Sequence, residues 1–139
     1  MSYAADAALQ AAVYGQLAND PAISGQIGNA VYDALPAGPL PGTYITLGPE
    51  DARARADGTA GGAWHRFTIT VVTEEAGFQV AKTLAAAIND ALVDAPLTLT
   101  RGHLAALHFH RARAKRDSSG QRRRIDLTFR ARIDDAPQP

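Results

Sequence analysis

The sequence predicts a single α+β domain over residues 1–139, with two helices packed on one face of a mostly antiparallel four-stranded sheet and a long C-terminal β-hairpin. Residues 122–133 alternate strictly between polar and apolar side chains, which is typical of a strand with one covered face. Residues 77–93 change to a helical spacing of three and four. The apolar fraction of 46% suits a globular protein with one hydrophobic core.

The first helix is expected over residues 4–18, where Leu9, Val13 and Leu17 form an apolar stripe. It should end at Asn19-Asp20-Pro21, because proline disfavours helical backbone in the residue before it. Residues 30–35 fit a brief strand or a turn. The following residues, 36–42, are rich in proline and glycine and leave no room for regular structure.

Two strands with a loop between them are expected next. Residues 43–47 are β-branched and aromatic and stop at Gly48-Pro49. Residues 64–73 alternate, which puts His65 on the same face as three apolar side chains and predicts that it lies in the core. The polar, aperiodic residues 50–62 between the two strands are expected to form a flexible loop.

The second helix and the hairpin complete the predicted fold. The helix should bury the apolar side chains of Phe78, Ala81, Leu84, Ala85, Ile88 and Leu92. Residues 104–114 and 122–133 read as strands, and the turn-forming residues 115–121 join them into a hairpin with a cationic tip. Residues 134–139 are expected to be a frayed tail.

The charges are distributed unevenly, although the net charge is zero. Residues 1–100 carry four cations and ten carboxylates, whereas residues 101–132 carry ten cations and two carboxylates. Such a chain suits nucleic-acid binding or association with copies of itself, for example head to tail in a ring. The candidate interface residues are the cations Arg53, Arg55, Arg111, Arg113, Lys115, Arg116, Arg122, Arg123, Arg124, Arg130 and Arg132.

The sequence offers no convincing catalytic or metal site. Cysteine is absent, which removes disulfides and thiolate chemistry. His108 and His110 form an H-x-H pair, but a metal needs further ligands, and His65 is predicted to lie in the core. The acidic residues occur as sequence neighbours, and Ser118-Ser119 has no base beside it. We therefore expect no enzyme activity, no cofactor and no bound metal.

The N-terminal residues lack the cationic and apolar regions of a signal peptide. No apolar run approaches the roughly 20 residues that span a bilayer. We therefore expect synthesis in the cytosol and no membrane partner.

Several local sequences occur in a characteristic order. They are Val31-Tyr32-Asp33 before Pro36, then residues 44–48, residues 65–72 leading into Gly77 and the helix 78–92, and residues 109–113, 117–120 and 125–129 in the hairpin. Together they resemble the tail terminator (tail completion) family of tailed bacteriophages, and the resemblance extends from Leu9 to Ile133. The sequence is also compatible with tail-like particles derived from prophages, such as gene transfer agents.

This resemblance implies a structural virion protein. Members of the family are small α+β proteins that form hexameric rings on the end of the tail tube, stop its polymerisation and join the tail to the head. The implied partners are copies of the same chain, the tail tube protein and a head–tail connector (stopper) protein, with possible passage of DNA through the lumen. The implied location is the bacterial cytoplasm during assembly and then the head-proximal end of the tail.

One alternative is a nucleic-acid-binding module that uses the basic hairpin. A two-stranded ribbon fits the major groove, and arginines neutralise phosphates. The domain as a whole is neutral, however, and its cationic face lacks the aromatic side chains that stack on single strands. A small ligand-binding or enzymatic domain remains only as a residual class.

Overall fold

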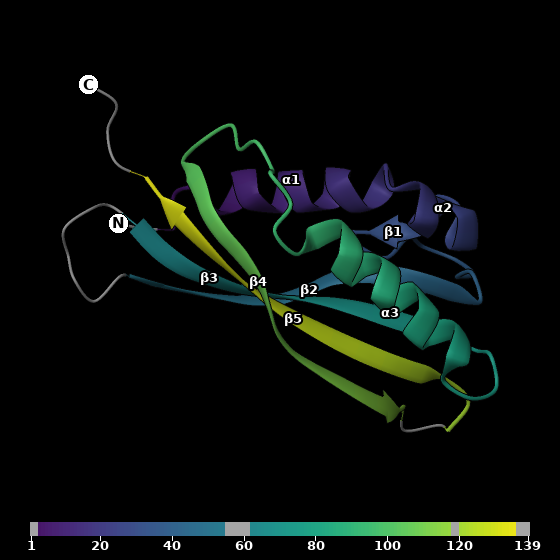
Figure 1. The fold of residues 1–139 in the computed structure, drawn as a ribbon. Coiled ribbons are helices and arrows are strands. Elements are labelled where there is room, and N and C mark those ends of the chain that lie inside the picture. The colour runs from purple at the N-terminus through teal and green to yellow at the C-terminus, as the bar shows by residue number, and fades with distance from the viewer. Residues whose placement is uncertain (1–2, 55–61, 118–119, 136–139) are drawn as a thin grey trace.

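In the computed structural model, which describes residues 3–54, 62–117 and 120–135, three helices lie on one face of a five-stranded sheet (Figure 1). The elements are α1 (Asp6–Ala18), α2 (Pro21–Ile27), β1 (Val31–Tyr32), β2 (Thr43–Ala54), β3 (Gly62–Thr73), α3 (Gln79–Leu92), β4 (His103–Arg116) and β5 (Arg123–Asp134). The predicted α+β class is confirmed. The predicted numbers of two helices and four strands are wrong, whereas the prediction of a mostly antiparallel sheet is confirmed.

The strand order in the sheet is β1-β2-β3-β5-β4. β1 pairs in parallel with β2, and the other neighbours are antiparallel, so the sheet is mixed. β4 and β5 form the predicted long hairpin, and β4 is the strand at the sheet edge. At the hairpin turn Gly120 has φ +75°, a backbone conformation that favours glycine.

The helix α2 is absent from the sequence prediction because Pro21 was interpreted only as the end of α1. Proline also suits the first position of a helix, where its missing N–H has no partner to lose. Here Asp20 caps α2, since its side chain accepts a hydrogen bond from the backbone N–H of Ile23 at 3.1 Å. The same dipeptide therefore ends one helix and begins the next.

Residues 50–54 and 62 of the predicted loop over residues 50–62 are strand in the structure. β2 continues to Ala54 through a bulge between Leu47 and Glu50, and β3 begins at Gly62. A bulge accommodates Pro49, which cannot donate a ladder hydrogen bond. Residues 55–61 and 136–139 lie outside the described residues, and Asp134 of the predicted tail is the last residue of β5.

The core lies between the helices and the sheet. Phe129 of β5 is fully buried and contacts two other rings, with centroid distances of 5.7 Å to Phe67 and 6.1 Å to Phe109. The predicted stripes of α1 and α3 face this core, with Phe78 packed at its margin. Because α3 has a polar outer side, its amphipathic pattern identified it correctly.

A polar cluster fastens the start of α1 to the sheet. Asp6 and His65, both buried, are joined by a contact of 2.9 Å between Oδ1 and Nδ1. Nearby, the hydroxyl of Tyr3 donates a hydrogen bond to Glu50 of β2. Burial and hydrogen bonding with Asp6 raise the pKa of Glu50, and the bond to Glu50 raises the pKa of Tyr3 to about 12. The prediction that His65 lies in the core is confirmed.

Candidate functional site

The face of the sheet opposite the helices, here called the open face, carries most of the cations of the strands. Alternation along each strand and the strand register place eight cations and three carboxylates of the described residues on it. The cations are Arg53, Arg66, Arg111, Arg113, Lys115, Arg124, Arg130 and Arg132. The carboxylates are Asp51, Asp126 and Asp134.

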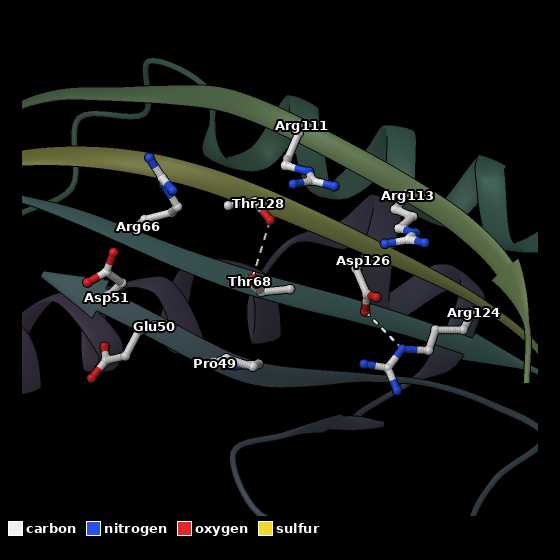
Figure 2. Close-up of a pocket in the computed structure, with 10 residues that line it drawn as sticks. All are labelled: Pro49, Glu50, Asp51, Arg66, Thr68, Arg111, Arg113, Arg124, Asp126 and Thr128. Carbon is white, nitrogen blue, oxygen red and sulfur yellow. Dashed lines mark hydrogen bonds and ion pairs between the residues drawn. The ribbon is translucent and has the colours of Figure 1, made fainter.

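A shallow hollow of about 370 Å³ lies on the open face. Figure 2 shows Arg111 and Arg113 reaching from β4 towards β5, with Arg66 on β3 and Arg124 on β5 around them. The floor of the hollow is polar, because it is formed by the threonines Thr68 and Thr128, whose hydroxyl groups are hydrogen-bonded to each other at 3.3 Å. We call this feature, defined by Arg66, Arg111, Arg113, Arg124, Thr68 and Thr128, the cationic groove.

Three carboxylates, Glu50, Asp51 and Asp126, also line the hollow and offset part of this charge. Asp126 accepts hydrogen bonds from Arg124 at 3.0 Å and from Thr70 at 2.7 Å. Within the described residues, no ion pair joins Arg66, Arg111 or Arg113 to a carboxylate. The excess positive charge affects His110: desolvation, followed by the charges of Arg66, Arg130 and Arg111, lowers its pKa. The groove is thus a region of positive potential.

The structure separates the predicted interface cations into groups. Seven of them lie on the open face: Arg53, Arg111, Arg113, Lys115, Arg124, Arg130 and Arg132. Arg116 and Arg123 pair on the opposite side of the hairpin, and Arg122 near the turn forms an exposed ion pair of 3.6 Å with Glu74. Arg55 lies outside the described residues.

Arg66 belongs to the cationic groove but was not among the predicted interface residues. It is exposed, and it alternates with the buried His65 and Phe67 on β3. That alternation was the signal that could have identified it. Trp64, two residues earlier on the same face, lies under Arg130, whose guanidinium carbon is 4.3 Å from the ring centroid. The expectation that the cationic face lacks aromatic side chains is therefore wrong at this position.

The far half of β4 has a different surface on its helix side. Phe109 is 46% exposed there, and Ala112 and Ala114, which pair with the buried Leu127 and Ile125, are exposed as well. This half of β4 lies apart from the helices (Figure 1). We call Phe109, Ala112 and Ala114 the hairpin strip.

The described residues contain no group of three or more His, Cys, Asp and Glu side chains that could hold a metal ion. His108 lies on the open face in register with Arg130. No helix within the described ranges is long and apolar enough to cross a membrane.

The comparisons with known proteins point to phage-type tails. The family model described as "Tail completion protein gp17" matches residues 11–134, which is most of the chain. The chain belongs to this family. A solved structure described as the virion of a native gene transfer agent (GTA) particle contains a similar chain, with 55% sequence identity and a TM-score of 0.91. The match covers 96% of this chain and 99% of that chain. A search of curated proteins finds no match.

In this tail completion family member the two layers carry opposite charge. The helical layer, defined as residues 3–42 and 74–102, contains seven carboxylates and only two cations, Lys82 and Arg101. The open face has the reverse balance. The uneven distribution along the sequence therefore becomes a separation in space.

Proposed function

We propose that this protein is a non-catalytic structural component of a phage-like tail. In this proposal it forms a hexameric ring on the end of the tail tube, stops tube polymerisation and joins the tail to the head connector. The observation that carries the proposal is the family match together with the 55% identity to a chain of a gene transfer agent virion. Assembly takes place in the bacterial cytoplasm, and the tube and connector proteins are the partners.

The separation of charge supports association between copies. A cyclic ring joins two different surfaces of neighbouring copies, so a chain with one acidic and one basic surface is suited to it. The hairpin end carries Arg116 and Arg123 beside the hairpin strip. We propose that this end contacts the helical layer of the next copy, where Glu74, Glu75 and Asp90 are exposed.

The hairpin strip suits such a contact better than the open face does. The centres of protein interfaces are depleted of charged side chains and enriched in aromatic ones. The strip offers an exposed phenylalanine flanked by alanines on a strand edge. Part of that edge is already covered within the chain, because the backbone N–H of Asp94 donates to the carbonyl of Leu107. The remaining edge, from His108 onward, is available to a neighbour.

The proposal is tested by electron microscopy of particles made with and without this protein. Without it, we expect overlong tubes that lack heads, because nothing stops the tube or supplies the joining surface. Expression of the intact chain from a second copy of the gene should restore tail length. Tails of normal length with heads attached, made in the absence of the protein, would contradict the proposal.

A further inference from the structure

The open face combines high positive charge with an almost complete lack of exposed apolar side chains. Besides its four arginines, the hollow is lined by Thr68, Thr128, Pro49 and the carboxylates Glu50, Asp51 and Asp126. Over the open face as a whole, eight cations outnumber three carboxylates. Protein partners bury apolar and aromatic side chains at the centre of their contact, whereas interfaces with nucleic acid are more polar and much more positive. The excess of cations and the polar character of the open face therefore favour a polyanion over a protein surface.

The spacing of the cations also suits a nucleic-acid backbone. Side chains on one face of a strand repeat about every 6.8 Å, so Arg111, Arg113 and Lys115 span about 14 Å along β4. That length corresponds to about four nucleotides of one DNA strand, at about 3.4 Å of helix axis each. Arg66 and Arg124 widen the row across β3 and β5 (Figure 2).

Protection of the strand edge does not account for this arrangement. Cationic side chains on an edge strand discourage unwanted pairing, and this explains cations on β4. Arg66 and Arg124, however, lie on β3 and β5, which have a neighbouring strand on both sides. Their guanidinium groups contribute to a face rather than to an edge.

We propose that the cationic groove binds the phosphodiester backbone of duplex DNA, without reading its sequence. This inference rests on the proposed ring and adds an orientation to it: the open face lines the channel, and the hairpin strip and the helical layer contact neighbouring copies. Each subunit would then present its arginines to DNA that passes through the ring.

The test measures binding of the purified chain to a 30-base-pair DNA duplex by fluorescence anisotropy, at salt concentrations between about 50 and 200 mM. The variant Arg66→Gln/Arg111→Gln/Arg113→Gln removes three phosphate contacts, so the slope of log K against log salt should become shallower by about 2.7. The matched control is Lys82→Gln/Arg101→Gln, which removes cations from the helical layer. The control should bind like the unchanged chain. Circular dichroism checks that both variants are folded.

A second measurement follows the His110 imidazole by NMR titration. Desolvation, followed by the charges of Arg66, Arg130 and Arg111, lowers the pKa of His110. Phosphates bound beside these arginines offset the contribution of their charges, so saturating DNA should raise that pKa. No binding by the intact chain at 50 mM salt, or equal loss in the triple variant and the control, would overturn the inference.

Tail length in particles carrying the triple variant separates this inference from the proposed function. Normal capping with lost DNA binding supports both. Overlong tubes with unchanged DNA binding would mean that the groove docks an acidic protein surface. That result overturns the inference about DNA but agrees with the proposed capping function. Normal tails in the complete absence of the chain would contradict the proposed function itself.

Discussion

Phe129 and Arg130 are neighbours on β5, but Phe129 is fully buried beneath the helices and Arg130 lies on the open face. The difference holds along the whole strand, where Ile125, Leu127 and Ala131 are also buried. Burial of apolar area is the main source of folding free energy, whereas exposed cations contribute little. The covered face therefore maintains the fold, and the side chains of the open face are available for partners.

The largest loss of stability should come from Phe129→Ala, on the covered face of β5. Removing the ring leaves a cavity between Phe67 and Phe109, and we expect a loss of about 3–5 kcal/mol in the free energy of unfolding, measured by urea denaturation. The matched variant Arg130→Ala loses one cation–π contact with Trp64, about 0.5–1 kcal/mol. Equal losses in the two variants would show that the open face also maintains the fold.

A smaller loss is expected from Asp6→Ala. The buried Nδ1 of His65 loses its partner, which should cost about 1–3 kcal/mol in the free energy of unfolding. The control is Arg101→Ala, which breaks an exposed ion pair with Asp135 and should cost less than about 1 kcal/mol. If both changes are equally mild, the cluster around Asp6 does not anchor α1.

The hairpin strip can be tested with Ala112→Asp. Ala112 is exposed, so the free chain should keep its stability within about 1 kcal/mol. Burying the new carboxylate against the next copy should cost more free energy than the change in the free chain. The association constant between copies, measured by sedimentation of reconstituted rings, should therefore fall at least tenfold, which is about 1.4 kcal/mol. Ala54→Asp, at the exposed end of β2 and outside both proposed contact surfaces, is the matched control. Rings that tolerate Asp at position 112 would exclude the strip from the contact.

The smallest effect concerns pH and Glu50. The pKa of Glu50 is raised by burial and by hydrogen bonding with Asp6, so the folded state holds this proton more tightly than the unfolded chain does. The associated stability is present below the unfolded pKa and is lost as the pH rises through the folded pKa. Glu50→Gln, which cannot ionise, should flatten the dependence of unfolding free energy on pH above about 4.5. Parallel pH profiles for the two proteins would contradict the assigned cause.

Sequence patterns predicted the parts of the fold that have one strong period. The alternation in β5 and the helical spacing in α3 were sufficient, because each element buries one continuous face. α2 was missed because Asp20-Pro21 can both end and begin a helix. The end of β2 was missed because the bulge at Gly48-Pro49 resembles a strand terminus in sequence. Both errors arise where tertiary pairing decides between two local interpretations.

The cationic hairpin and the alternation of side chains along β5 were predicted from the sequence, but the division of the β4 cations between two faces was not. Arg116 and Arg123 lie on the helix side, and the bulge between Phe109 and Arg111 shifts the alternation along β4. Arg66 joins the groove from β3, about 45 residues before Arg111 in the sequence. Only the register of β3, β5 and β4 brings these side chains together.

The most direct test of the two-face account uses adjacent residues on β4. The chain has no cysteine, so Ala112→Cys and Arg113→Cys each supply a single thiol for labelling with a small maleimide. In assembled particles, the account predicts that position 112 is protected by the next copy, while position 113 stays reactive in the water-filled channel. A protected position 113 beside a reactive position 112 would contradict it.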